Sequence, residues 1–223
     1  MKTRKVVTRA PHREVGVVNA AWLLDQPVEH ESFLEKCFIM VALSCPVVTE
    51  IIHQPIEMKL VYGPDDVETY TPDFKIGFRD GDHATVEVKS TYFVQKNQRK
   101  LDAAKRQLAA DSLKFDLFTE KEINKNGLSA RAILLMRYAR MTFSEPDALE
   151  CKRILEEECS GSAHVHELMS KGVNEALIWN MVARHNFRVP AGLNITPLET
   201  VEINHPQGEC HDYFRSWFGL TRG

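Results

Sequence analysis

The first half of the chain combines one stretch of helical periodicity with several strand-like stretches. Residues 32–44 place Leu34, Phe38 and Val41 on one apolar stripe, and this stretch ends before Cys45-Pro46. Residues 47–52, 56–62, 68–78 and 84–89 have strand-like composition and are separated by turn-forming residues. The pattern predicts a leading helix followed by an antiparallel meander.

The next two stretches predict a crossover that returns the chain to the sheet. Residues 94–110 have helical periodicity, and residues 114–118 resemble a buried strand. The outward face of this helix carries four cations that we predict to bind DNA: Lys96, Arg99, Lys100 and Arg106. Residues 15–126 are therefore predicted to form one α/β domain.

The pattern changes after about residue 126. Helical stretches cover residues 129–141, 146–158, 163–169 and 174–185, and strand-like stretches follow at 187–193 and 199–203. A helix, a Gly-containing turn, a second helix and a hairpin are typical of a winged helix, although many proteins share this outline. We predict a small, mostly helical, winged-helix-like interaction domain at residues 127–223.

Polar residues on two of the predicted strands suggest chemistry. Val86 and Val88 point to one side of their strand, and Glu87 and Lys89 point to the other, because side chains alternate along a strand. Asp73 follows Pro72 on the preceding strand. Carboxylates brought together in this way repel one another unless a cation such as Mg²⁺ or Mn²⁺ binds them. The layout therefore suits metal-dependent cleavage of phosphodiesters, with Lys89 orienting water or neutralising the transition state.

The same residues also fit a plainer interpretation. Asp73 suits a turn, Glu87 and Lys89 suit a solvated strand face, and a PD…ExK pattern with thirteen intervening residues often occurs by chance. Glu35 is similarly ambiguous. Its spacing from Ser32 is that of a capping box, yet it lies beside the apolar stripe, which points its carboxylate inward as a site residue.

Charge is unevenly distributed along the chain. The 223 residues carry a net charge of −3, which argues against DNA binding through bulk charge alone. Residues 89–140, however, hold twelve Lys and Arg against five Asp and Glu, a surplus of seven positive charges. Residues 1–14 form a predicted basic arm. Both segments suit local contact with nucleic acid, although a charge run is more often a solvated face.

The five cysteines contain no CxxC pair and are odd in number, which argues against a disulfide framework and favours the cytoplasm. No apolar run is long enough for a membrane helix, and no signal-peptide core follows the basic N-terminus. Zinc-ligand residue types occur in the second half, but their spacing is not that of a zinc finger. These ligand types are Cys151, Cys159, His164 and His166.

Several motifs occur in an order that resembles a known family. They are Ser32-x-Leu34-Glu35, Val47-Val48, Gln54-Pro55, Thr71-Pro72-Asp73-Phe74, Val86-Glu87-Val88-Lys89 and residues 117–124. Over roughly residues 30–125 the chain resembles TnsA, the endonuclease subunit of heteromeric cut-and-paste DNA transposases. Gln54-Pro55 is interpreted mainly as a turn that shapes the cleft.

The resemblance implies a restriction-endonuclease-like core of the PD-(D/E)xK type in a bacterial cytoplasmic protein. Glu35 falls on the family's helical acid, Asp73 and Glu87 fall on its metal-binding pair, and Lys89 falls on its lysine. The family sometimes has Gln at the position of Glu87. The implied activity is Mg²⁺- or Mn²⁺-dependent cleavage at the 5′ ends of a transposon. The implied partners are transposon-end DNA, a TnsB-type transposase and a TnsC-type AAA+ ATPase.

Two other functions remain open. A free-standing restriction or repair nuclease would share the fold and would cut DNA without partners. A non-catalytic DNA-binding assembly factor would retain the nuclease fold only as a scaffold.

Overall fold

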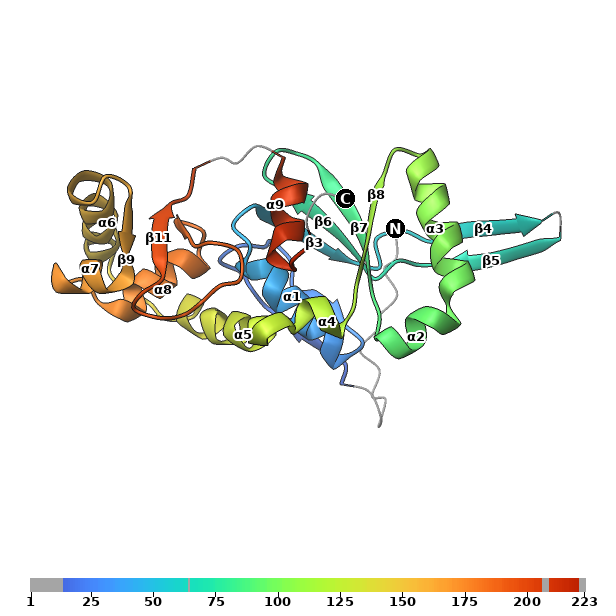
Figure 1. Ribbon diagram of the computed structural model, residues 1–223, viewed down its shortest axis with the longest axis horizontal. Helices are drawn as coiled ribbons and strands as arrows, with labels where there is room; N and C mark the ends of the chain where they lie inside the picture. Colours follow the sequence, from blue (N-terminus) through green and yellow to red (C-terminus); the bar gives the residue numbers. More distant parts are fainter. Residues whose placement is uncertain (1–13, 64, 206–208, 221–223) are drawn as a thin grey trace.

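The computed structural model describes residues 14–63, 65–205 and 209–220. The predicted basic arm, apart from Glu14, lies outside these residues. Figure 1 shows an elongated molecule in which the main sheet lies between the C-terminal helices and the helix α3. No helix in the described part of the chain is long and apolar enough to cross a membrane. None of the five cysteines, all of which lie in the described ranges, forms a disulfide.

The first half contains helices and strands close to the predicted ranges. In chain order they are β1 (Gly16–Val18), β2 (Val28–His30), α1 (Phe33–Ser44), β3 (Val48–His53), β4 (Met58–Gly63), β5 (Asp66–Tyr70), β6 (Phe74–Phe78), β7 (His83–Val88), α2 (Thr91–Lys96), α3 (Gln98–Ala110) and β8 (Lys114–Phe118).

The main sheet has four strands in the order β3-β6-β7-β8. The pairs β3–β6 and β6–β7 are antiparallel, whereas β7 and β8 are parallel. A parallel pair needs a crossover connection, and α2 and α3 provide it. The predicted return of the chain to the sheet through a helix is therefore confirmed.

The predicted meander is wrong in one respect. The expected strand at residues 68–78 is two strands, because residues 71–73 leave the ladder between β5 and β6. Pro72 has no N–H to donate to a ladder, which favours a break at this point. β5 pairs instead with β4 in a separate two-stranded sheet, and this hairpin projects from the body of the molecule (Figure 1). Asp73 consequently precedes β6 and does not end a strand.

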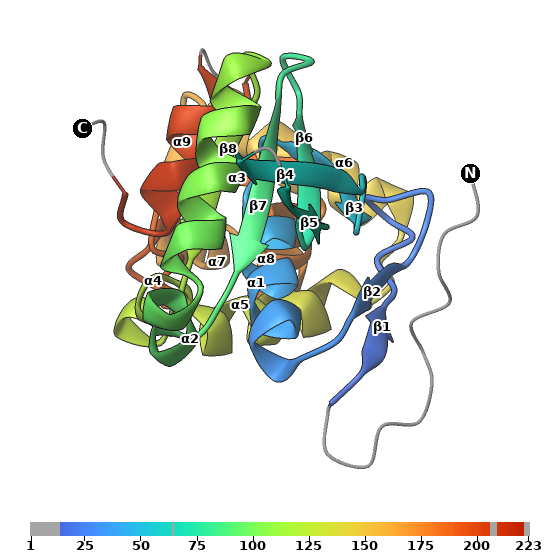
Figure 2. The ribbon, with the colours of Figure 1, turned by 90° about the vertical axis from the view of Figure 1, so that its right-hand side faces the viewer.

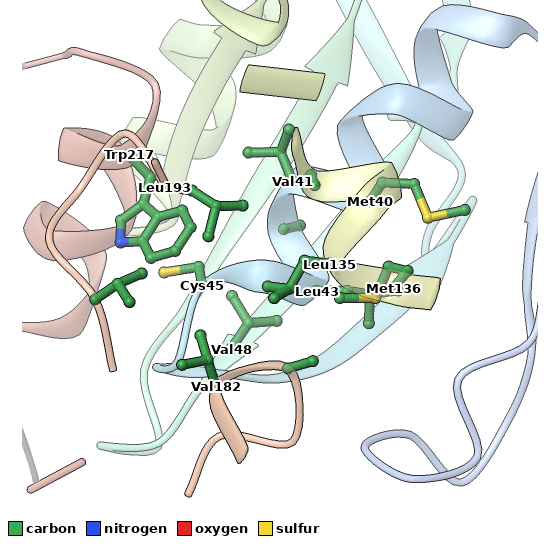
Figure 3. Close-up of a cluster of buried hydrophobic side chains, with 14 of the residues drawn as sticks. Met40, Val41, Leu43, Cys45, Val48, Leu135, Met136, Val182, Leu193 and Trp217 are labelled. Atoms are coloured by element: carbon green, nitrogen blue, oxygen red, sulfur yellow. The ribbon is translucent and has the colours of Figure 1, made fainter. Parts of the chain in front are cut away.

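The helix α1 is the centre of the hydrophobic core. Nine of its twelve residues are buried, so it is covered on nearly all sides and not on one stripe alone. The Phe38 ring lies 5.4 Å from the rings of both Phe74 and Phe118, which come from β6 and β8. Figure 3 shows Met40, Val41 and Leu43 among side chains from the second half of the chain. The core thus joins the sheet to the helices that follow it.

The second half begins with α4 (Glu120–Ile123) and contains the four predicted helical stretches. The elements after α4 are a 3₁₀ turn (Lys125–Gly127), α5 (Leu128–Ala139), α6 (Glu145–Arg153), a π-helical turn (Ile154–Glu158), β9 (Ser162–His164), α7 (Val165–Ser170), α8 (Glu175–Ala183), β10 (Phe187–Arg188), β11 (Thr200–Ile203) and α9 (Cys210–Trp217).

The strands predicted after the helices form an antiparallel pair, β10 and β11. A third strand, β9, pairs with the other side of β11, so the helix expected from residue 163 starts at Val165. The winged-helix-like description of residues 127–223, and the domain boundary near residue 126, stay predictions.

The last helix, α9, was not predicted and packs against the main sheet formed by the first half of the chain. Its Phe214 is fully buried, and the ring lies 5.8 Å from Phe118 and 5.4 Å from Phe78 of the main sheet. Nε2 of His211 is hydrogen-bonded to Oδ2 of the Asp116 carboxylate of β8 at 2.6 Å. Two chain segments about ninety residues apart therefore share one core.

Candidate active site

The strands β6 and β7 bring three of the four predicted site residues together. Phe74 lies opposite Val86 in the antiparallel ladder, so the residue before Phe74 lies beside the residue after Val86. The Val88 N–H donates to Oδ2 of Asp73 at 2.8 Å, and Lys89 forms an ion pair with Oε1 of Glu87. Figure 2 shows the end of β7 between α2 and the first turn of α1. Asp73, Glu87 and Lys89 are thus adjacent at this end of the sheet.

Glu87 is buried, and each of its carboxylate oxygens accepts from one donor. Only 3% of its surface is exposed, and Oε2 accepts a 2.7 Å hydrogen bond from the Tyr70 hydroxyl. Burial and the charge of Glu87 raise the pKa of Tyr70, so the phenol keeps its proton and remains a donor. No role for Tyr70 is predicted from the sequence. No periodic signal could have indicated one, because Tyr70 ends the hairpin sheet while Glu87 belongs to the main sheet.

Glu35, the fourth predicted site residue, makes only half of the capping box that its spacing suggested: the Ser32 hydroxyl accepts from the Glu35 N–H at 3.1 Å, but the Glu35 carboxylate does not accept from the Ser32 N–H. Its Oε1 accepts from the Ser32 hydroxyl at 2.8 Å, and its Oε2 accepts from the Glu31 N–H at 2.7 Å. Glu35 is nevertheless only 8% exposed, and burial raises its pKa, with smaller contributions from the charges of Glu31 and Glu87. The Glu35 carboxylate therefore holds the N-cap Ser32 and the loop before α1, while it remains within electrostatic range of Glu87.

The three acids raise one another's energy when ionised. Burial, followed by the charges of Glu87 and Glu35, raises the pKa of Asp73 well above its usual value, although the Val88 N–H and Lys89 act in the opposite direction. Burial lowers the pKa of Lys89, but the neighbouring carboxylates outweigh burial and raise it overall. One lysine thus faces three carboxyl groups, an imbalance that a divalent cation would offset.

The donor set fits a metal that takes few protein ligands. In the part of the chain that the structure describes, no three His, Cys, Asp or Glu side chains are grouped closely enough to hold an ion. Mg²⁺ commonly binds through one or two carboxylates, with water and substrate phosphate completing its shell. Asp73 and Glu87 can provide such a pair. Glu35 could join them only by releasing the hydrogen bonds that it accepts from Ser32 and Glu31.

Gln54 links the two acid-bearing segments. Its N–H donates to the Asp73 carbonyl at 2.8 Å, and its side-chain amide donates to Oε1 of Glu31 at 3.0 Å. Glu31 in turn donates its N–H to Glu35. The φ angle of Gln54 is 46°, in the left-handed region that residues other than glycine seldom adopt. The turn predicted at Gln54-Pro55 is therefore also a connection between Asp73 and the loop before α1.

The four predicted DNA-binding cations lie on the crossover helices, but two of them are paired with acids of the hairpin. Arg99 contacts Asp66 at 2.5 Å, and Lys100 contacts Glu68 at 2.7 Å. Lys96 donates to the Tyr92 hydroxyl at 2.7 Å, and Arg106 is exposed on α3. Lys96 and Arg106 are consequently the better placed of the four for a phosphate backbone. The DNA-binding role of all four stays a prediction.

Comparison with known proteins places the site within a described family domain. Residues 45–120 match the family model described as TnsA-like endonuclease N terminal. The matched segment contains Asp73, Glu87 and Lys89, and it excludes Glu35 and the chain after residue 120. No curated protein matches the chain. The match confirms, over residues 45–120, the family resemblance inferred from the motifs and supports a TnsA-type endonuclease.

Proposed function

We propose that the protein is an Mg²⁺-dependent DNA endonuclease that cleaves the 5′ ends of a transposon as part of a heteromeric cut-and-paste transposase. The TnsA-like domain supports a transposase-associated nuclease. The observation that carries the finer proposal is the pairing of half-buried Asp73 with buried Glu87, with Lys89 bound to the Glu87 carboxylate.

Each residue of the site would have a separate role in hydrolysis. Asp73 and Glu87 would hold the cation, which when bound polarises the scissile phosphate and lowers the pKa of bound water. The Val88 N–H fixes the orientation of Asp73, and the Tyr70 hydroxyl fixes that of Glu87. Lys89 carries its positive charge next to the carboxylates, where it can neutralise charge that develops on the phosphate.

The charge of the chain supports action within a complex. A net charge of −3 gives little general affinity for DNA, so a nuclease of this kind gains from partners that deliver the substrate. We propose that a TnsB-type transposase cuts and joins the 3′ ends and that a TnsC-type AAA+ ATPase completes the complex. Lys96 and Arg106 would provide local contacts with the transposon-end DNA.

Strand-specific cleavage tests the proposal. The substrate is a DNA labelled on each strand at the transposon end, and the full chain is supplied with any TnsB-type and TnsC-type subunits encoded beside its gene. Asp73→Ala and Lys89→Ala should each abolish 5′-strand cleavage, while circular dichroism shows an unchanged fold. Lys75→Ala is the matched control, because Lys75 lies on β6 but pairs with Glu50. Normal cutting of the 5′ strand by Asp73→Ala refutes the proposal.

Two further outcomes would assign a different function. Sequence-selective cutting by the purified chain alone favours a free-standing nuclease. Titration calorimetry with Mn²⁺ addresses the other alternative. If the wild-type protein gives no heat of Mn²⁺ binding, a non-catalytic assembly factor is favoured. The same conclusion follows if the heat persists when Asp73 and Glu87 are both replaced.

A further inference from the structure

The short helix α2 exposes two adjacent aromatic side chains. Tyr92 is 65% exposed and Phe93 is 51% exposed, and none of the residues of α2 is buried. Their rings meet edge to face, with centroids 5.0 Å apart and planes at 75°. Neighbouring exposed aromatic rings are typical of a surface that binds another molecule.

The position of these rings is fixed relative to the cluster of site acids Asp73, Glu87 and Glu35, called the acid cluster below. α2 begins at Thr91, two residues after Lys89, and Phe93 is four residues beyond that lysine. Four residues span at most about 14 Å, which is about four base steps of duplex DNA. The Lys89 N–H donates to the Phe118 carbonyl at 3.0 Å, and the Thr91 N–H donates to Glu120 at 2.8 Å. The start of α2 is thereby tied to the strand end that carries the site.

A cation accompanies the aromatic pair. The Lys96 ammonium lies 4.1 Å from the centroid of the Tyr92 ring and 6.0 Å from that of Phe93. Lys96 is exposed, so its charge faces solvent next to the rings. Planar apolar faces beside a positive charge match the two parts of a nucleotide, its base and its phosphate.

We propose that Tyr92 and Phe93 form a stacking surface for a nucleobase next to the scissile phosphate, with Lys96 contacting a neighbouring phosphate. This inference rests on the proposed nuclease function, because it takes the substrate of the adjacent acid cluster to be DNA. A protein partner would also bury aromatic rings. The adjacent cation and the short distance along the chain from Lys89 favour DNA.

A binding assay with a fluorescent base tests the stacking directly. The probe is a duplex with a three-nucleotide unpaired segment that contains 2-aminopurine, and the protein is the full chain carrying Asp73→Asn, so that it binds without cutting. Adding Tyr92→Ala and Phe93→Ala together should weaken binding about tenfold and remove the quenching of 2-aminopurine. Replacing both rings by Trp should restore binding and quenching.

The matched control is Leu149→Ala, which removes an exposed apolar side chain from α6. Figure 1 shows α6 at the opposite end of the molecule from α2. This control should bind the probe like the parent protein. Lys96→Ala should weaken binding and reduce the slope of log affinity against log salt concentration by about one.

The outcomes separate this inference from the proposed function. If the parent protein binds the probe and the double alanine variant binds and quenches equally well, the stacking surface is refuted while the nuclease proposal stands. If DNA binding is unchanged but the double variant no longer retains a purified TnsB-type subunit, the rings contact protein and the inference is likewise refuted. If the wild-type protein with its partners does not cut DNA, the nuclease proposal fails first.

Discussion

Replacing Asp73 by asparagine should stabilise the metal-free protein at neutral pH, although most substitutions of buried residues destabilise. Asp73, Glu87 and Glu35 share one lysine, so removing one negative charge relieves repulsion in a buried site. Asparagine keeps a carbonyl oxygen that can accept the 2.8 Å hydrogen bond from the Val88 N–H. The substitution therefore removes charge while it preserves the local geometry.

The magnitude follows from proton linkage. Burial and the two neighbouring acids raise the pKa of Asp73 in the folded protein above the ordinary value of 3.8. The folded state then binds more protons than the unfolded state, so stability falls as the pH rises from about 4 through the folded pKa. A single group changes the free energy of unfolding by at most about 1.4 kcal/mol per pH unit. For a chain of this length that change corresponds to about 3–6 °C in Tm per pH unit.

Thermal unfolding in EDTA between pH 5 and pH 8 measures this slope. The wild-type protein should lose stability relative to Asp73→Asn as the pH rises, and Asp111→Asn, which neutralises an exposed acid after α3, should follow the wild type. Mn²⁺ at about 100 times its Kd should stabilise the wild type by about 2.7 kcal/mol and Asp73→Asn by much less. Parallel pH profiles, or equal stabilisation by Mn²⁺, would refute the electrostatic account of the site.

Three further predictions concern the surroundings of the site. Phe214→Ala should lower the free energy of unfolding in urea by about 3–5 kcal/mol, because its buried ring packs on Phe38 and Phe118, whereas a loss under 1 kcal/mol would mean that α9 lies outside the nuclease core. Burial lowers the pKa of His185 to about 4, so the unfolded chain binds the extra proton and about 3 kcal/mol of stability should be lost as the pH falls from 6.5 to 4. His185→Gln should remove this pH dependence in thermal melts, and an unaltered profile would contradict the assignment. Gln54→Gly suits the left-handed backbone but removes the amide that ties this turn to the loop before α1, so cleavage should fall while Tm changes little. Full cleavage by that variant would show that the hydrogen bond from the Gln54 amide to Glu31 is not needed for activity.

Local periodicity was sufficient to predict most of the individual elements. The stripe of α1 and the β-branched runs of β3 and β7 are local patterns that survive in the fold. Strand pairing is not local, and the hairpin of β4 and β5 could not be told from a meander because both use the same alternating composition. The helix α9 was missed for a related reason. Its buried Cys210, Phe214 and Trp217 do recur at a helical spacing, but the helix is only eight residues long and packs against distant aromatic rings.

The same distinction applies to the candidate site. Asp73, Glu87 and Lys89 could be grouped from the sequence because they lie on or directly beside β6 and β7, which are neighbours in both chain and space. Tyr70 and Gln54 could not be assigned, because their contacts cross from one sheet or loop to another. Glu35 was ambiguous for a physical reason. Its carboxylate accepts hydrogen bonds at the start of α1 and also lies within range of the charge of Glu87, so both interpretations describe real interactions.

This double use of Glu35 bears on how the site would bind metal. Its two oxygens already accept hydrogen bonds from Glu31 and Ser32, and hydrogen bonds to a charged group contribute about 1.5–3 kcal/mol each. Asp73 and Glu87 also accept hydrogen bonds, but Glu87 repels Asp73 more strongly than Glu35 does, and an ion between Asp73 and Glu87 relieves that repulsion. Glu35 would bind the ion at the cost of the bonds that hold the start of α1. We therefore expect Asp73 and Glu87 to bind the ion first. Glu35 would then join only when DNA or a partner rearranges the start of α1, which would couple metal coordination to assembly of the complex.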